Sequence, residues 1–294
     1  MKLISEINEF IDKTKNLKVA VIGETIIDEF VHVNYEGRSM KSNCSVLRRE
    51  SKIQKQYGGA AVIAKHLEEF VDSVTLISNS KEEIVKTRYI DSFSGEKYVE
   101  INKFDTGFFG KISVDTNDYD IVIVADFGHG FCDQLDINDG FHLMCQTNSN
   151  NYGFNRVSKW RQHRKKSITI DKREGSLQIN KRADFKTDEE ILELHNYEAN
   201  TDDLFLTLGS VGSVFTNGSI VCRQGGFSTM VVDTIGAGDT FFAFSSVASA
   251  IGLKNENKML IPSLAAALST TWLCNEKNVS PKRLLSFAKN YSKG

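Results

Sequence analysis

The sequence predicts an α/β fold, a doubly wound and mostly parallel sheet that carries a small β-sheet lid. Short, continuous apolar runs alternate with segments of helical periodicity, as the strands and crossover helices of a parallel sheet do. Two further segments alternate polar and apolar residues, which is typical of strands with one exposed face. We expect residues 1–294 to form a single domain, with the lid formed by about 28–50 and 86–105.

The first strand is expected at Lys18–Gly23, where a continuous apolar run ends in glycine. Its carboxyl end should face a ligand crevice, because ligands of open α/β sheets collect at that edge. Two-faced strands are expected at Asp28–Tyr35 and Glu96–Phe104. Between them, paired glycines open an expected helix over Gly58–Phe70. The two-faced strands would form the lid.

The rest of the chain continues the alternation of strands and helices. Buried strands are expected at 73–78, 119–125, 140–147 and 167–171. A helix with an acidic start is expected at 188–196, and short strands separated by glycine turns at 204–208, 212–216, 219–223 and 227–232. Three helices should follow, at roughly 236–252, 256–273 and 280–291.

Composition narrows the possible partners. Lys and Arg number 36 against 38 Asp and Glu, for a formal charge of -2, so no global basic field would draw the protein to nucleic acid or to a membrane. The first residues lack the apolar region of a secretory signal, so a cytoplasmic location is expected. The 5 cysteines form no C-x-x-C pair and the 6 histidines are scattered, which fits neither a disulfide framework nor a zinc site.

The segment Val232–Phe241 carries the most chemical information. An expected strand enters a turn made of Gly236, Ala237 and Gly238, and a helix begins at once. These small residues would let a phosphate approach the backbone N–H groups at the positive end of the helix. Asp239 in the first turn would repel that phosphate, so we assign it a task, which is to accept the proton of an attacking hydroxyl.

A plainer alternative stays open for this segment. Asp233 or Asp239 would then only cap the helix, and the glycines would only shape a turn. A dinucleotide-binding turn is disfavoured, because the third glycine of that motif is missing and the segment lies near the carboxyl end. The P-loop motif does not occur in the sequence.

Residues 233–239, Asp-Thr-Ile-Gly-Ala-Gly-Asp, resemble the C-terminal signature of the ribokinase-like (PfkB) carbohydrate kinases. The resemblance extends from about residue 18 to the end, and it implies a ribokinase-like fold. It includes a first strand that ends in a sugar-binding Asp, a glycine substrate turn and a nucleotide-side turn, at Val21–Asp28, Gly58–Ala64 and Thr207–Gly212. Lys86–Ile90 and Ala125–Gly130 look like the lid and strand-end segments of the kinases that act on heptose 7-phosphate.

The resemblance implies an ATP-dependent sugar kinase that transfers the γ-phosphoryl group to a hydroxyl of a sugar or sugar phosphate. Asp239 would be the base, and Gly236, Ala237 and Gly238 would hold the phosphoryl group through backbone N–H groups. Mg²⁺ would bridge the nucleotide phosphates mainly through waters, with Glu190 as an indirect ligand. The sugar would contact Asp28, Gly58 and Gly59, and the nucleotide would contact Thr207, Gly209, Gly212 and Thr234.

A sugar that already carries a phosphate needs a cationic partner, preferably arginine. Arg88, next to a lid segment, and Arg173, at a strand end, are the candidates, although each is also explained as an ordinary solvated residue. An open lid leaves apolar side chains exposed unless a partner covers them. Related kinases often pair through this element, so a homodimer through the lid is expected.

Two positions depart from the family pattern. Val62 stands where the glycine turn usually continues to a sugar-binding Asn, and Thr187 replaces the Asn of an N-x-x-E motif that ends at Glu190. These departures leave two alternatives open, a nucleoside kinase on the same fold and a non-catalytic regulator that binds sugar or nucleotide. The identity of the sugar, the reacting hydroxyl and the preferred nucleotide also stay open.

Overall fold

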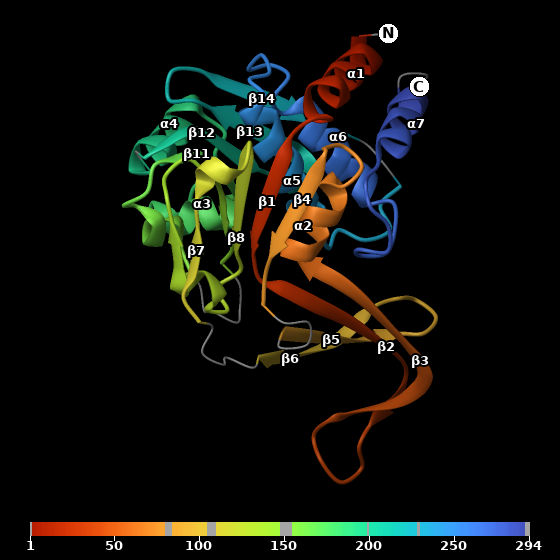
Figure 1. Cartoon of the computed structure of the whole chain (residues 1–294). Helices are drawn as coiled ribbons and strands as arrows, with labels where there is room; N and C mark the ends of the chain where they lie inside the picture. The colour runs from red at the N-terminus through yellow and green to blue at the C-terminus, as the bar shows by residue number, and fades with distance from the viewer. Residues whose placement is uncertain are drawn as a thin grey trace.

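The computed structural model describes residues 2–79, 84–104, 110–147, 155–198, 200–227 and 230–291. Within these ranges, the main sheet has 8 strands in the order β14-β13-β12-β11-β10-β8-β1-β4 (Figure 1). The strands from β12 to β4 run parallel, and β13 and β14 add an antiparallel edge. Their bounds are β1 Lys18–Gly23, β4 Ser73–Ile77, β8 Ile121–Asp126, β10 His142–Cys145, β11 Lys165–Asp171, β12 Thr201–Thr207, β13 Gly212–Thr216 and β14 Val221–Gly225.

Helices cover both faces of this sheet. Val19 and Val21 of β1 pack into one core with α1, α2, α5, α6 and α7, while Ala20 and Ile22 pack into a second core on the opposite face, beside α3 and α4. The period of two along β1 is what a strand buried on both sides requires. The helices are α1 Lys2–Thr14, α2 Ala60–Leu67, α3 Lys172–Gln178, α4 Asp188–Tyr197, α5 Ala237–Ala250, α6 Leu260–Ser269 and α7 Pro281–Tyr291.

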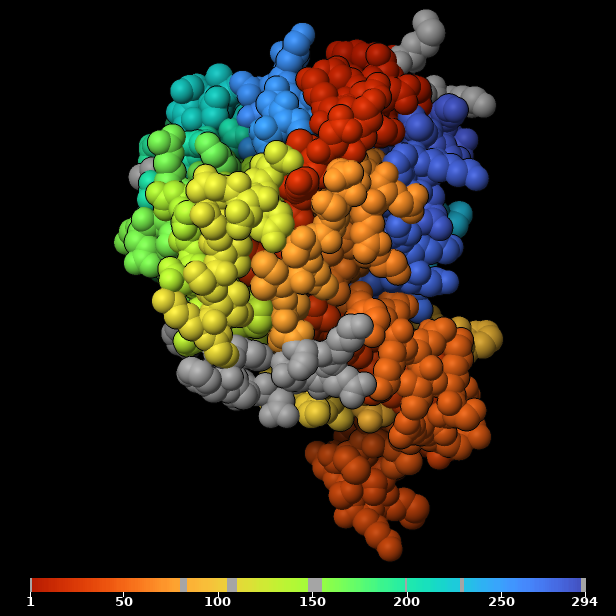
Figure 2. All heavy atoms as spheres, viewed as in Figure 1, coloured from red at the N-terminus to blue at the C-terminus, as the bar shows by residue number. Residues whose placement is uncertain are grey.

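A second sheet of 4 strands, here called the lid, has the order β3-β2-β5-β6. Its strands are β2 Thr25–Arg38, β3 Ser45–Gly59, β5 Ile84–Asp91 and β6 Lys97–Phe104. The hairpin of β2 and β3 projects from the body of the molecule (Figures 1 and 2). The lid therefore uses residues 25–59 and 84–104, a longer first segment than the 28–50 that the sequence predicted. A small pair of parallel strands, β7 Ile112–Val114 and β9 Leu135–Ile137, forms a third sheet, and Val114 and Ile137 pack into the second core.

The predicted α/β fold with a lid is confirmed, but three predicted elements are wrong in detail. The strand β4 was expected to be buried, yet it lies at the sheet edge with most of its residues exposed or half-buried. Residues 230–232 of the strand expected at 227–232 are not a strand, and 228–229 lie outside the described residues. The backbone N–H groups of Val232 and Asp233 instead donate to the carbonyl of Thr270, 2.8 and 3.2 Å away. The helix expected at 256–273 begins only at Leu260, after a series of turns.

Every helix in the described part of the chain is too short or too polar to cross a bilayer. The helix expected at 236–252 is α5, and most of its residues are buried.

Candidate active site

The glycine turn before α5 has one crowded side and one open side. Gly236 is the N-cap of α5 with φ +83°, and a Cβ there would lie 2.3 Å from Oδ1 of Asn275. A Cβ on Gly238 would meet no atom within 4 Å. The first glycine is therefore required by a close approach in left-handed backbone, while the second leaves open space at the positive end of a helix. This arrangement can bind an anion, because backbone N–H groups at a helix N-terminus do so.

Asp239, in the first turn of α5, carries the carboxylate predicted to be the base. Burial and, to a smaller extent, the nearby Asp28 carboxylate raise its pKa, and the Lys86 ammonium lowers it; the net pKa is about 7. Its carboxylate makes no hydrogen bond or ion pair with any other described residue. A carboxyl with this pKa exchanges a proton near neutral pH, as a general base must.

The helix-cap alternative finds no support in the geometry. The N-cap of α5 is Gly236, which has no side chain to cap with. Asp233 accepts instead from the backbone N–H of Ile235 at 3.2 Å and from Nζ of Lys97 at 3.0 Å. The second contact joins the lid strand β6 to the loop that precedes the glycine turn.

Asp28 lies in β2, where the lid leaves the body. Its Oδ1 accepts from Nη1 of Arg88, and its Oδ2 accepts from the side-chain amide of Asn275 at 3.4 Å. A Cβ on Gly58 would lie 2.5 Å from that Oδ2, and a Cβ on Gly59 would lie 2.2 Å from the carbonyl oxygen of Glu24. The paired glycines therefore allow β3 to pass close to the predicted sugar-binding carboxylate.

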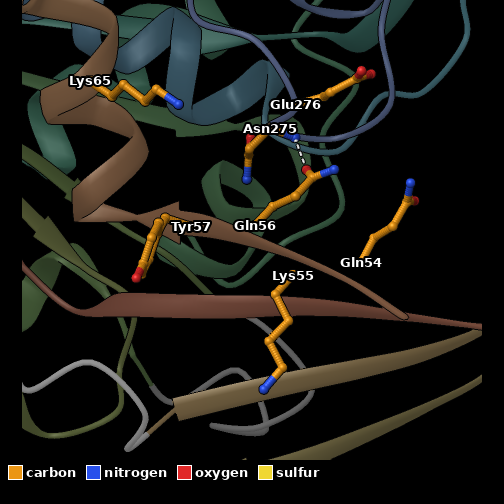
Figure 3. A pocket seen from close by; sticks show the side chains of 7 residues that line it. All are labelled: Gln54, Lys55, Gln56, Tyr57, Lys65, Asn275 and Glu276. Atoms are coloured by element: carbon orange, nitrogen blue, oxygen red, sulfur yellow. Dashed lines mark hydrogen bonds between the residues drawn. The ribbon is translucent and has the colours of Figure 1, made fainter. Parts of the chain in front are cut away.

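Asn275 connects the two predicted subsites, and the sequence analysis missed it. Its backbone N–H donates to Oε1 of Gln56 at 2.7 Å, its side-chain amide donates to Asp28, and its Oδ1 lies against Gly236. Figure 3 shows Asn275 and Gln56 facing each other over a pocket that is also lined by Gln54, Lys55, Tyr57, Lys65 and Glu276. Its sequence signal is weak, a polar residue in a loop between two helices.

The inner face of the lid presents two cations from β5, Lys86 and Arg88, each only 9% exposed. Arg88 is engaged at two of its three nitrogen atoms, because Nη1 donates to Asp28 and Nε donates to Oε2 of Glu100 at 2.9 Å. Its guanidinium also lies 5.8 Å from the centre of the Phe30 ring. Lys86 has no hydrogen bond or ion pair with another described residue. Burial lowers its pKa, and the carboxylates of Asp28 and Glu100 oppose that shift.

His66, also missed from the sequence, fixes the glycine turn from the side of α2. The backbone N–H of Val279 donates to its Nδ1 at 2.9 Å, so the proton of the neutral ring sits on Nε2 and points to Oγ1 of Thr240, 3.0 Å away. Thr240 in turn donates to the carbonyl of Gly236 at 2.9 Å. Burial lowers the pKa of His66 to about 3, which keeps the ring neutral at physiological pH.

Three of the four predicted nucleotide residues, Thr207, Gly209 and Gly212, lie at or beside the carboxyl end of β12, and Thr234 lies in the loop before α5. Thr207 is the last residue of that strand, and Gly209 has φ +62° in the turn that follows. Gly212 has φ +122°, and a Cβ there would lie 2.0 Å from the carbonyl oxygen of Gln224. Thr234 is exposed, and its carbonyl accepts from the N–H of Ala237 at 3.3 Å. Their contact with a nucleotide stays a prediction.

Glu190 and Arg173 have simpler local roles than those predicted. Thr187 and Glu190 form a capping box on α4, in which Oε2 of Glu190 accepts from the N–H groups of Lys186 at 2.8 Å and Thr187 at 3.3 Å. This arrangement leaves Oε1 of Glu190 for a metal-bound water, so the residue fits an indirect contact to Mg²⁺. Arg173 is exposed in the first turn of α3. Both ligand roles stay predictions.

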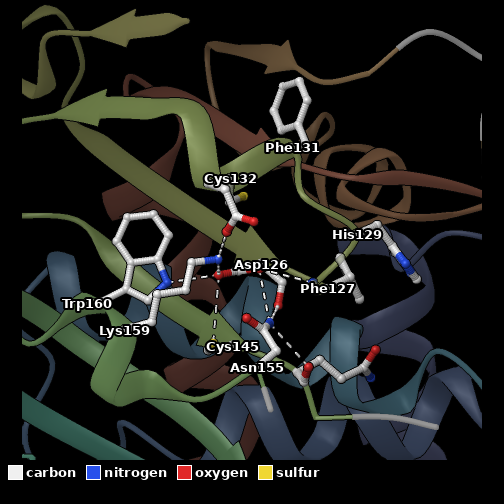
Figure 4. A network of polar contacts seen from close by, with 12 residues as sticks. Asp126, Phe127, His129, Phe131, Cys132, Cys145, Asn155, Lys159 and Trp160 are labelled. Atoms are coloured by element: carbon white, nitrogen blue, oxygen red, sulfur yellow. Dashed lines mark hydrogen bonds and ion pairs between the residues drawn. The ribbon is translucent and has the colours of Figure 1, made fainter. Parts of the chain in front are cut away.

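A second acidic cluster lies at the ends of β1 and β8, where Glu24, Asp126 and Cys132 offer ligand atoms within 4.8 Å of one another. Asp126 accepts from Nζ of Lys159 at 2.8 Å and from the Trp160 indole at 2.9 Å, among other donors (Figure 4). Glu24 accepts three backbone N–H groups of the loop that follows β8. With these donors in place, the cluster acts as a buried anchor for that loop.

Comparisons with known proteins agree with this geometry. Residues 172–271 match the family model described as pfkB family carbohydrate kinase. The structure of ribokinase from Thermotoga maritima is similar with a TM-score of 0.67 and 18% identity, covering 93% of this chain and 100% of that one. The nucleoside kinase of Methanocaldococcus jannaschii reaches 0.66 and 16%, covering 94% and 99%. Ribokinase of Arabidopsis thaliana, solved with ribose and ATP, reaches 0.64 and 16%, covering 93% and 99%.

No curated protein matches the sequence. The structural similarities establish the ribokinase-like fold, and the family match spans the glycine turn, Asp239 and α5. The chain thus has the ribokinase-like fold, and its residues 172–271 match the model of the pfkB family carbohydrate kinases.

Proposed function

We propose that this protein is an ATP-dependent kinase that transfers the γ-phosphoryl group to a hydroxyl of a sugar or sugar phosphate. One observation carries the proposal: Asn275 lies against both the glycine turn at Gly236 and the Asp28 carboxylate. An acceptor held by Asp28 would therefore sit beside the anion site at the start of α5. Asp239, with a pKa of about 7, lies within electrostatic range of Asp28 and Lys86, because both residues shift its pKa.

The residues divide the work of phosphoryl transfer. Asp28 accepts hydrogen bonds from the sugar hydroxyls, and the absence of side chains at Gly58 and Gly59 lets the sugar approach the backbone. Asp239 takes the proton of the attacking hydroxyl as its oxygen forms a bond to phosphorus and the bond to the leaving ADP oxygen breaks. The N–H groups of the glycine turn stabilise the transferring group without reorganisation. Mg²⁺, when bound to the nucleotide phosphates, would neutralise their charge.

The finer substrate is a sugar phosphate of the heptose 7-phosphate type, supported by the lid segment Lys86–Ile90 and the strand-end segment Ala125–Gly130. A nucleoside is the second candidate, and a nucleoside kinase is among the proteins with this fold. Val62 cannot make the sugar contact that the family's Asn usually makes, because its side chain is apolar and only 1% exposed. This difference is the reason to keep acceptors other than the usual sugar. A regulator without turnover is the third candidate. Cytoplasmic location stays an expectation from the sequence.

Homodimerisation through the lid is part of the proposal. On the lid surface opposite Lys86 and Arg88, an apolar row crosses all four strands through the paired residues Ile53, Val31, Tyr89 and Val99. Ile53 and Val99, at the ends of the row, are 41% and 43% exposed. A second lid would cover this row. Light scattering on the intact protein and on Ile53→Glu tests it, because the charge should shift a dimer to monomer.

ADP release measured across a panel of acceptors, with ATP and Mg²⁺ present, tests the proposed activity. The panel holds sugars, sugar monophosphates and ribonucleosides, and Asp239→Asn serves as the control for contaminating kinases. We expect a sugar or sugar phosphate to drive ADP release in the intact protein alone. ADP release driven best by ribonucleosides would support the nucleoside alternative, and heat stabilisation by ligands without any turnover would support the regulator.

A further inference from the structure

At the base of the lid, the side chains of Lys86 and His129 carry nitrogen atoms that have no partner among the described residues. Lys86 is 9% exposed and lacks a hydrogen bond or ion pair with any described residue. His129 is 8% exposed, and its Nε2 atom has no hydrogen-bond partner in the described structure. Burying such groups without partners costs free energy, and a ligand that accepts hydrogen bonds from them removes the cost.

The two side chains reach the same region from different elements. Lys86 and Ile84 share the inner face of β5, one pleat apart, and Ile84 pairs with Phe104 of β6. The Phe104 ring stacks on the His129 imidazole, with centroids 4.7 Å apart and planes 24° apart. Burial and, to a smaller extent, the positive charge of Lys86 lower the pKa of His129 to about 4, so the two groups lie within electrostatic range of each other.

His129 is presented by a loop whose backbone is fixed. Oε1 of the buried Glu24 accepts from the N–H groups of His129 and Phe131, each at 3.2 Å, and Oε2 accepts from Phe127 at 2.8 Å. Glycines with φ +74° and +98° flank His129, at positions 128 and 130. The imidazole is thus held in place before any ligand arrives, as a built binding site requires.

Two neighbouring regions of the lid differ in how their charges are paired. Asp28, Glu100 and Asp239 all attract Lys86, but the first two already receive hydrogen bonds from Arg88. Arg88 is therefore occupied in holding the acceptor-side carboxylate, and it is poorly placed to bind a phosphate. The remaining cation, Lys86, lies between this pair and His129 along the inner face of the lid.

We propose that Lys86 and His129 form a subsite for a phosphate ester carried by the acceptor, at the end of the sugar away from the reacting hydroxyl. The ammonium supplies the charge, and the neutral imidazole donates its Nε2–H to a phosphate oxygen. The subsite rests on the proposed function and narrows it, because the acceptor class becomes sugar monophosphates. Arg88 and Arg173 then have no part in binding that phosphate.

The test compares each sugar monophosphate with its parent sugar: ribose 5-phosphate, fructose 6-phosphate and sedoheptulose 7-phosphate beside ribose, fructose and sedoheptulose. Lys86→Gln removes the charge, and His129→Phe removes the N–H while keeping a ring to stack on Phe104. Lys103→Gln is the matched control, because it removes the same charge from an exposed position on β6. KM and kcat are measured with ATP, and Kd is measured by calorimetry without ATP. Circular dichroism confirms that each variant is folded.

We expect Lys86→Gln to raise KM and Kd for the preferred sugar monophosphate by about ten- to a hundredfold and to leave Kd for the parent sugars unchanged. Because the Lys86 charge also lowers the pKa of Asp239, any change in kcat should be the same for phosphorylated and parent sugars. His129→Phe should act in the same direction and Lys103→Gln should have no effect. If Lys86→Gln weakens the binding of phosphorylated and parent sugars equally, the subsite is wrong while the kinase stands. If the intact protein binds a sugar monophosphate through Lys86 without ever releasing ADP, the subsite stands and the proposed activity fails.

Discussion

The two glycines of the turn before α5 should respond in opposite ways to the same substitution. Alanine at Gly236 must adopt left-handed backbone, which costs about 1–2 kcal/mol. Its Cβ would also lie 2.3 Å from Oδ1 of Asn275 and would displace that side chain from Asp28. Losing a hydrogen bond to a charged group costs about 1.5–3 kcal/mol. Gly236→Ala should therefore lower the free energy of unfolding by roughly 3–5 kcal/mol.

Gly238→Ala is the matched control for stability and the sharper probe of function. A Cβ there meets nothing within 4 Å, and alanine favours the helix over glycine by up to about 1 kcal/mol. The variant should be at least as stable as the parent protein. It should nevertheless lose phosphoryl transfer, because the methyl group fills the space that the γ-phosphoryl group is proposed to occupy.

Urea unfolding and ADP release on both variants distinguish these effects. A double variant, Gly236→Ala with Asn275→Ala, should lose less stability than the sum of its single changes, since the clash partner is gone. An unchanged unfolding midpoint in Gly236→Ala would refute the close approach to Asn275. Full activity in Gly238→Ala would refute the assignment of the open space to the phosphoryl group.

Further predictions concern proton transfer and stability at Asp239, the His66 contact and the metal. Because Asp239 acts as a base only when ionised and its pKa is about 7, kcat/KM should fall about tenfold per pH unit below 7, and a flat profile from pH 5 to 8 would contradict this role. The pKa of Asp239 is raised from its ordinary value of 3.8 to about 7, so the ionisation of Asp239 destabilises the fold as the pH rises through this range. Asp239→Asn should therefore be more stable than the parent protein at pH 8 but not at pH 4, as urea unfolding would show. His66→Phe, which breaks the contact to Thr240, should lower kcat more than ATP affinity, and equal losses in both would point to a general packing defect. EDTA should abolish ADP release, and Glu190→Gln should raise the Mg²⁺ concentration needed for half-maximal activity. If Glu190→Gln lowers the melting temperature but leaves the Mg²⁺ dependence unchanged, Glu190 only caps α4.

Local signals made much of the fold predictable. The strand β1 has a continuous apolar run, and α5 follows a glycine turn that small residues make visible in the sequence. The strand β3 was missed because it is polar and mostly exposed, and its backbone pairing with β2 shapes it more than burial does. The strand expected at 227–232 was wrong at 230–232, because those apolar residues, Met230 to Val232, are exposed and lie beside another loop.

The candidate site was predictable only where one segment carries the chemistry. Asp28, the paired glycines and Asp239 sit within short motifs, so their residue types were informative. Asn275 and His66 act across the chain: the contact from Asn275 to Gln56 spans 219 positions, and that from Val279 to His66 spans 213. The engagement of Arg88 by Glu100 likewise depends on the register of β5 and β6. No local pattern encodes such contacts, because the tertiary fold creates them.

The rate of phosphoryl transfer in Asp239→Asn, measured beside its affinity for ATP, tests the central claim most directly. Asparagine keeps the size of the side chain and cannot accept the proton of the acceptor hydroxyl. We predict a loss of about 10²- to 10⁴-fold in kcat with ATP binding preserved. Turnover at the parent rate would contradict the account, because the carboxylate beside the glycine turn would then have no part in the reaction.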